Sequence, residues 1–212
     1  MTPDYMRVLA ARMGTLVDML AELQQELFNI AAPPESTQRR LTGLFTTPLT
    51  GAARKLTPYE RIAPAVYFGF QDTAAAAIRV LPKPNHGASP ESCLNIVELD
   101  YSGTSLWFTL EVACSPSELV GAQRYQLSIH AHPDRPIGVM VVLRLPQKDG
   151  KDLDHHFANL KITPERRATV ASGELKLPDF DSHQDRAPTL LFFFDSDRDL
   201  KLRLDYINVY FA

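Results

Sequence analysis

The chain of 212 residues has little cysteine and little glycine, and each shortage excludes a class of protein. Its two cysteines, Cys93 and Cys114, cannot form a disulfide framework or supply all four ligands of a structural zinc site. Its ten glycines form no phosphate-binding loop, dinucleotide fingerprint or nucleophile elbow. Because these local signatures of catalysis are missing, we expect that the protein is not an enzyme.

An excess of charge of one sign and a long apolar run are also missing. Lys and Arg number 22 against 25 Asp and Glu, a net charge of −3. A nucleic-acid-binding protein normally carries a basic surface, so no nucleic-acid partner is expected. No apolar run approaches the ~18 residues of a membrane helix. Asp4, Arg7, Arg12 and Asp18 interrupt any signal-peptide pattern. We therefore predict a cytoplasmic protein without a membrane span.

What the sequence does contain is a heptad repeat within residues 1–31. Its a and d positions are Met6, Leu9, Met13, Leu16, Leu20, Leu23, Leu27 and Ile30. A period of 3.5 residues, held for almost four heptads, predicts a coiled-coil helix and therefore a homo-oligomer of two, three or four chains. The alternative is an ordinary amphipathic helix that packs on its own domain.

The rest of the chain divides into a predicted linker over 32–63 and a β-rich domain over 64–212. The linker is rich in Thr, Pro, Ala and Arg, with a short helical turn expected near 38–45. Beyond it, prolines separate apolar runs and never interrupt them. The predicted strands are 66–70, 76–81, 93–101, 106–115, 124–132, 138–145, 156–162, 168–177, 190–195 and 200–211. This pattern predicts a mainly β fold, an antiparallel β-sandwich of jelly-roll type.

Alternation along three of these runs identifies candidate ligand-binding side chains that point away from the core. Trp107 and Glu111 alternate with apolar residues in 106–114, as Gln126 and His130 do in 124–132 and Arg144 does in 138–145. If the three strands lie in one sheet, these five side chains share its outer face. An aromatic ring beside planar polar groups is a composition typical of a sugar site. The alternative is a solvated face on which the linker or a neighbouring subunit covers Trp107.

Two further runs predict topology. The run Leu-Leu-Phe-Phe-Phe over 190–194 is apolar at both parities, which predicts a central strand covered on both faces. The last run changes phase, because Leu200, Leu202 and Leu204 alternate first and Ile207, Val209 and Phe211 alternate afterwards. One extra residue near Asp205 therefore predicts a β-bulge.

The strand-rich pattern, a Trp-containing strand followed by a Tyr-containing one, and the terminal Leu-Arg-Leu-Asp-Tyr-Ile-Asn-Val-Tyr-Phe resemble the jelly-roll carbohydrate-binding modules. The resemblance covers residues 64–212 and implies a carbohydrate ligand. In many such modules the aspartate of the last strand is a structural calcium ligand, which implicates Asp205 as a metal ligand. Calcium takes about six to eight oxygens. The N-terminal segment with glycine and glutamate that normally supplies the others is missing, so we expect no cofactor. The alternative for Asp205 is a bulge residue bonded to the backbone or facing solvent.

The string His130-Ala131-His132-Pro133-Asp134 raises a second metal hypothesis. Histidines two residues apart on a strand share a face and can bind one zinc ion. The string is similar to the His-x-His-x-Asp-His signature of the metallo-β-lactamase superfamily, but Arg135 replaces its last histidine. We therefore favour two polar histidines at a strand end.

Two functions from different classes are compatible with these features. The first is a non-catalytic carbohydrate-binding protein that its coiled coil makes multivalent, since tethering weak sites raises avidity by ~10²–10⁴. The second is a structural or adaptor oligomer whose β-sandwich binds another protein. The expected partner is accordingly a glycan or a protein.

Overall fold

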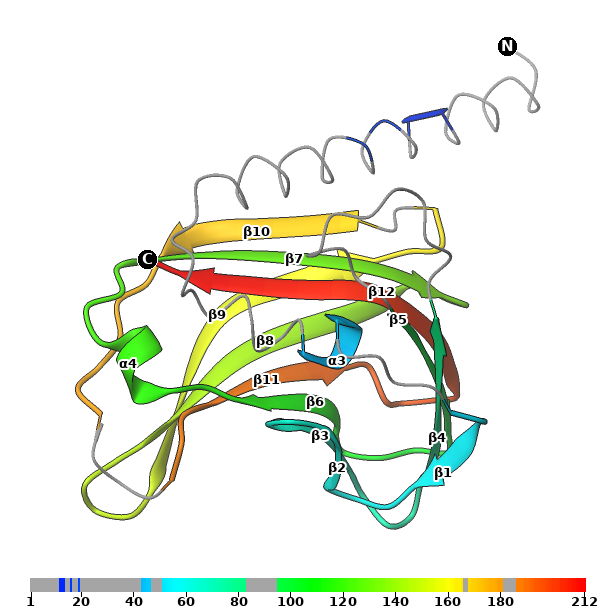
Figure 1. Ribbon diagram of the computed structural model, residues 1–212, viewed down its shortest axis with the longest axis horizontal. Coiled ribbons are helices and arrows are strands. Elements are labelled where there is room, and N and C mark those ends of the chain that lie inside the picture. Colours follow the sequence, from blue (N-terminus) through cyan, green and yellow to red (C-terminus); the bar gives the residue numbers. More distant parts are fainter. Residues whose placement is uncertain are drawn as a thin grey trace.

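The computed structural model is a two-layer β-sandwich (Figure 1). It describes residues 12–13, 16, 19, 43–46, 51–82, 95–165, 168–180 and 186–212. The predicted mainly β fold is confirmed, because twelve strands form two antiparallel sheets of six. The predicted coiled coil lies outside the described residues, apart from four helical positions, which are Arg12, Met13, Leu16 and Met19.

The first sheet has the order β1-β4-β5-β12-β7-β10. Its strands are β1 (Arg54–Leu56), β4 (Ala75–Pro82), β5 (Asn95–Ser102), β12 (Leu200–Phe211), β7 (Arg124–Pro133) and β10 (Ala168–Glu174). The pairing of β12 with β7 shifts register between Leu204, opposite Ala131, and Tyr206, opposite His130. This shift confirms the predicted bulge and leaves Asp205 as the extra residue.

The second sheet has the order β2-β3-β6-β11-β8-β9. Its strands are β2 (Glu60–Ala63), β3 (Val66–Phe70), β6 (Phe108–Ala113), β11 (Thr189–Phe194), β8 (Ile137–Pro146) and β9 (Asp152–Ile162). Strand β11 pairs with β6 on one side and β8 on the other. Leu190, Leu191 and Phe192 are all buried. The predicted central position of this strand is therefore confirmed, while its outer face is covered only in part, because Leu191 is buried there and Phe193 is half-buried.

The sandwich includes residues that precede position 64. Strands β1 and β2 fall within the range expected to be a linker, and each lies at the edge of its sheet. Their sequences, Arg-Lys-Leu and Glu-Arg-Ile-Ala, are short and charged, as edge strands often are, and so carry little alternation.

Two short helices accompany the sheets. Helix α3 (Gly43–Thr46) buries Leu44 and Phe45 in the core, and the side-chain amide of Asn95 donates a hydrogen bond to the Leu44 carbonyl at 3.1 Å. Helix α4 (Pro116–Leu119) follows β6. In the described part of the chain, no helix has the length and apolar character needed to cross a membrane.

An aromatic stack fills the core between the two sheets. The ring centroids of Tyr101 and Phe108 lie 4.6 Å apart, and Phe108 also contacts Phe68 and Phe194, at 5.7 and 5.8 Å. Offset and tilted aromatic pairs of this kind stabilise a core beyond the area they bury. Because the inner faces are filled in this way, polar side chains that could bind a ligand gather on the two outer faces.

Candidate functional site

Strand register arranges the outer face of the second sheet in rows. One row consists of Gly69, Thr109, Phe193, Met140 and Asn159, and the next consists of Tyr67, Glu111, Leu191, Val142 and His156. Side chains within a row point to the same side of the sheet, since the side-chain direction alternates along every strand. The face therefore combines aromatic and aliphatic surface with planar polar groups.

A hollow of about 580 Å³ lies at one end of this face. The lining residues that concern ligand binding are Trp107, Met140, Asn159, Phe193, Asp195 and Asp197. Its volume is within the range of small-molecule sites, roughly 300–1,000 Å³. Trp107 is half-buried, and its indole Nε1 is buried without a hydrogen-bond partner among the described residues. The hollow is therefore lined by a flat aromatic ring, whose indole N–H is buried beneath the surface.

Local hydrogen bonds hold Trp107, the residue immediately before β6. The Ser105 hydroxyl donates to the Trp107 carbonyl at 2.6 Å and accepts from the Trp107 amide at 3.3 Å. The side chain of Gln71 accepts a bond of 2.8 Å from the Leu106 amide. These contacts hold the backbone of Leu106 and Trp107 at this end of the hollow.

Two carboxylates at the same end of the sheet are also held by the protein. Asp195 accepts a hydrogen bond of 2.6 Å from the Gly138 amide. A Cβ atom on Gly138 would lie 3.1 Å from Asp195 Oδ1, so the absence of a side chain at Gly138 lets the Asp195 carboxylate lie close to its backbone. Asp197, which is largely exposed, lies 3.5 Å from the guanidinium of Arg135. Each carboxylate retains acceptor capacity for a ligand hydroxyl.

Glu111, in the middle of the face, has an unusual environment. Burial raises the pKa of its carboxyl, while the 2.8 Å hydrogen bond from the Thr109 hydroxyl and the positive charge of Arg144 act in the opposite direction. A Cβ atom on Gly69 would lie 2.5 Å from both Glu111 Oε1 and Thr109 Oγ1. Gly69 therefore makes room for this carboxyl.

Arg144 and Asp154 form a bidentate pair on the same face. Arg144 Nε and Nη2 donate to the two carboxylate oxygens at 2.8 and 2.9 Å. These hydrogen bonds hold the pKa of Asp154 below its ordinary value and raise that of Arg144. The planar geometry of the pair fixes both side chains.

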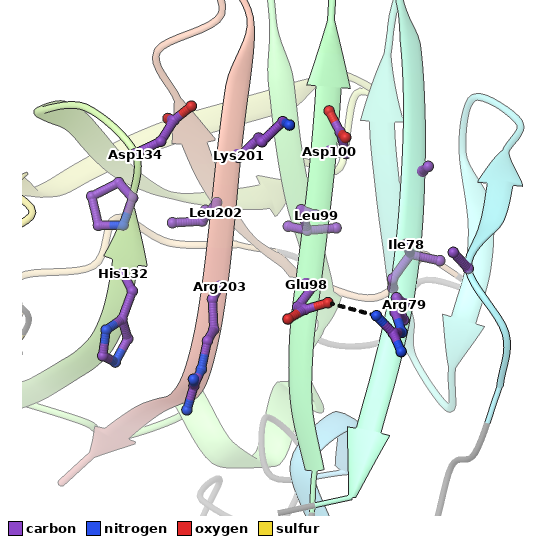
Figure 2. A pocket seen from close by; sticks show the side chains of 13 residues that line it. Ile78, Arg79, Glu98, Leu99, Asp100, His132, Asp134, Lys201, Leu202 and Arg203 are labelled. Atoms are coloured by element: carbon purple, nitrogen blue, oxygen red, sulfur yellow. Dashed lines mark ion pairs between the residues drawn. The ribbon is translucent and has the colours of Figure 1, made fainter.

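The outer face of the first sheet carries a different surface, a groove of about 470 Å³. Register places Arg79, Glu98, Arg203 and His132 in one row across it, and Figure 2 shows these side chains on four neighbouring strands. Arg79 and Glu98 form an ion pair of 3.8 Å. Asp100, Lys201 and Asp134 lie along the other side. The groove is thus bordered by charges of both signs, and its lining residues include the His132 imidazole but no Trp, Tyr or Phe.

At the end of this groove, the bulge residue Asp205 is buried among nitrogen donors. Its Oδ2 lies 3.0 Å from His130 Nδ1 and 2.9 Å from His132 Nε2, and its Oδ1 accepts a bond of 2.8 Å from Arg203 Nε. Burial by itself would raise the pKa of Asp205, but the hydrogen bonds from His130, His132 and Arg203 together hold it far below its ordinary value. The ring of Tyr206 stacks on His130 at 5.5 Å.

The structure divides the five predicted ligand-binding residues between the two outer faces. Trp107, Glu111 and Arg144 lie on the second sheet, immediately before β6, in β6 and in β8. Gln126 and His130 lie in β7, which pairs with β12 and β10 in the first sheet. The condition that the three strands share one sheet is therefore not met, and the five side chains do not form one site.

Asp205 differs from both expectations. It is a bulge residue, but its carboxylate is buried and bonded to side chains rather than to backbone or solvent. Its described neighbours are nitrogen donors, two imidazoles and a guanidinium. They do not fit calcium, which takes about six to eight oxygen ligands.

Sequence reasoning missed the partners of Trp107. Phe193 lies in a run that is apolar at both parities, so alternation assigned it to neither face, and Met140 lies in the predicted strand 138–145. Neither could be placed beside Trp107, because this requires that β11 pair with both β6 and β8. In the same way, the sequence pattern gave no reason to place Asp205 beside the two histidines, because their proximity depends on the pairing of β12 with β7.

Comparison with known proteins gives similarity in fold only. No protein-family model matches the sequence, and no curated protein matches it significantly. Among solved structures, the CBM22-1 xylan-binding domain of Paenibacillus barcinonensis Xyn10C is 9% identical with a TM-score of 0.45, over 76% of this chain and 96% of that one. The C-terminal family 22 carbohydrate-binding module of Clostridium thermocellum Xyn10B is 11% identical, with a TM-score of 0.46, over 79% and 90%.

A third similar structure is a family 11 carbohydrate-binding module from Clostridium thermocellum in complex with a β-1,3-1,4-mixed-linked tetrasaccharide. It is 13% identical with a TM-score of 0.44, over 77% of this chain and 98% of that one. All three similar structures are carbohydrate-binding modules, and the similarity to them is distant. At these identities and TM-scores it assigns neither a ligand nor a binding residue to this chain.

Proposed function

We propose that this protein binds carbohydrate without catalysis, through the hollow on the outer face of its second sheet. The observation that carries the proposal is the aromatic end of that hollow. There the ring of Trp107 lines the same cavity as Phe193 and Asn159.

The chemistry of a sugar ring explains why this composition suits it. A pyranose has an apolar C–H surface and a rim of hydroxyls, so it binds where a flat aromatic surface adjoins planar hydrogen-bonding groups. Trp107 and Phe193 supply aromatic surface. Asn159 supplies both a donor and an acceptor, and Asp195 supplies acceptors. The groove on the first sheet lacks the aromatic part of this set among its lining residues.

The state of the nearby carboxyl groups favours binding over hydrolysis. Glycoside hydrolysis needs one carboxyl that protonates the leaving group and a second that acts opposite it. Asp195 is bonded to the Gly138 amide, and Asp197 faces Arg135. Glu111 has a raised pKa, but its carboxyl is bonded to Thr109, and Glu111 does not line the hollow. We assign these groups to hydrogen bonding and positioning.

We further propose that a jelly-roll-type sandwich of this kind is presented in several copies by a coiled coil formed by residues 1–31. Met13 and Leu16 occupy an a and a d position in the apolar stripe of the predicted heptad repeat, and each is more than half exposed. A second copy of the same segment would cover such a stripe. Shallow sugar sites gain most from tethering, since each one binds weakly by itself.

A glycan-array screen of the intact protein tests the proposal, with Trp107→Ala and the control Glu98→Ala screened beside the wild type. Glu98 lies on the other sheet and in a partly exposed ion pair, so its removal should leave glycan binding unchanged. Trp107→Ala should reduce affinity for the bound glycan by roughly 10-fold or more, with fold and mass retained. An array with no reproducible signal, or equal loss in both variants, would reject the proposal.

One observation favours a second function, that of an adaptor which binds another protein. Leu106, next to Trp107, is 84% exposed and lines the same hollow. Aromatic and aliphatic side chains that are exposed together are typical of the centre of a protein interface. In this case the array shows no binding, and a pull-down with the wild type recovers a protein that the Trp107→Ala variant does not recover.

A further inference from the structure

The centre of the first sheet brings a carboxylate between two histidines. His130 and His132 are two residues apart in β7 and therefore share its outer face. The neighbouring strand β12 places Arg203 opposite His132 and Tyr206 opposite His130, with Asp205 as the extra residue between them. A bulge redirects a side chain in this way.

Three atoms of the kind that bind metals converge at this point. Asp205 Oδ2, His130 Nδ1 and His132 Nε2 all lie within 4.8 Å of one another. The side chains are 6%, 14% and 25% exposed, respectively, so the cluster is sheltered but reachable. Two imidazole nitrogens and one carboxylate oxygen are a common ligand set for divalent transition metals in proteins.

We propose that His130, His132 and Asp205 bind one divalent transition-metal ion of the zinc class. With bonds of about 2.0–2.1 Å in a tetrahedral site, adjacent ligand atoms lie about 3.3 Å apart. The two distances from Asp205 Oδ2, 3.0 and 2.9 Å, are shorter than this by only a few tenths of an ångström. Small rotations of the rings and the carboxylate would open the required space.

The surrounding residues fit this assignment. Arg203 donates to Asp205 Oδ1, the oxygen that faces away from the histidines, and so orients the carboxylate. Such hydrogen bonds to ligating carboxylates are typical of metal sites. Tyr206 stacks on His130 and restricts the rotation of its ring.

Three protein ligands leave the fourth position of a tetrahedral ion for water or another small oxygen ligand. His132 and Arg203 both line the groove of about 470 Å³ on this face, and Figure 2 shows them side by side on neighbouring strands. The fourth ligand would therefore reach the ion from the groove. This site lies on the opposite face of the sandwich from the hollow beside Trp107, so its test is independent of the carbohydrate proposal.

Calorimetric titration of the tag-free, full-length, chelator-treated protein with Zn²⁺ tests the site. Wild type should bind one ion per chain. His132→Gln should weaken binding by at least roughly 10-fold, as loss of a metal-site residue does. The matched control is His156→Gln, the same change in β9 of the other sheet, and it should bind as the wild type does. No saturable binding by the wild type, or equal affinity in the two variants, overturns the proposal.

A second measurement uses the wild type alone and does not depend on how a variant folds. Nitrogen-15 NMR of the imidazole rings, with and without Zn²⁺, reports which ring nitrogens bind the ion. The geometry requires Nδ1 of His130 and Nε2 of His132, the two nitrogens that face Asp205. Zinc-induced shifts at other histidines, or at the opposite nitrogens of these two rings, would show that the ion binds elsewhere.

Discussion

At the scale of single residues, the outer face of the second sheet depends on which side chains are small. Gly69 lies opposite Thr109 in the register, and a Cβ at this position would be 2.5 Å from the oxygens of both Thr109 and Glu111. The missing side chain lets the Glu111 carboxyl lie against the sheet, where burial raises its pKa. Gly69 therefore provides the space that the Glu111 carboxyl occupies, and the raised pKa of Glu111 follows from its burial there.

Glu111→Gln is expected to gain stability over the wild type as the pH rises. A carboxyl whose folded-state pKa is raised contributes its full stability below the unfolded pKa of about 4.3, and this stability is lost as the pH rises through the folded-state pKa. A glutamine at this position stays neutral, so its contribution to stability does not change with pH. Urea denaturation of both proteins at pH 4 and pH 7 measures the difference. If the free energy of unfolding of the variant, relative to that of the wild type, is higher at pH 4 than at pH 7, the pKa of Glu111 is not raised in the folded protein.

At the scale of elements, the two central strands set the position of both candidate sites. Strand β11 joins β6 to β8 and so brings Trp107, Phe193 and Asn159 around one hollow. Strand β12 joins β5 to β7 and so brings Asp205 to the two histidines. In each case the side chains come from strands that are distant in sequence, and these strands are brought together because they pair with the same central strand.

Adjacent phenylalanines of β11 should have opposite roles. Phe192 is fully buried between the sheets, and truncation of such a residue costs about 3–5 kcal/mol. Phe193 is half-buried on the outer face, so Phe193→Ala should cost less than half as much and should weaken glycan binding instead. Urea denaturation and glycan titration of both variants measure the two effects. Equal destabilisation by the two changes would contradict the assigned alternation.

The same elements explain how much the sequence could predict. Alternation and proline spacing are local, and they gave strands such as 66–70 and 200–211 with the bounds observed for β3 and β12. The phase change at Asp205 is also local, and the bulge was predictable. Sheet membership is not local, because it depends on pairings such as Leu200 with Tyr101. For this reason Gln126 and His130 were grouped with Trp107, although β7 belongs to the other sheet.

At the scale of the whole molecule, the sandwich separates its two outer faces by a filled core. The layers of a sandwich lie about 10 Å apart, and here the space holds the stack of Phe68, Tyr101, Phe108 and Phe194. A sugar on one face and a metal ion on the other could therefore influence each other only through packed side chains. The two proposed sites should act independently.

The number of sandwiches in one assembly is set by residues 1–31, according to the proposed coiled coil. Leu16→Asp with Leu23→Asp places charges at two d positions of the heptad and should convert the oligomer into a monomer. Light scattering measures the mass. The sandwich itself should be unaffected, so binding of a soluble monovalent sugar should stay the same, while binding to a glycan-coated surface should fall by ~10²–10⁴ as avidity is lost. A mass equal to that of the wild type would reject self-association through this segment. A monomer that still binds the surface with full strength would show that multivalency contributes nothing to recognition.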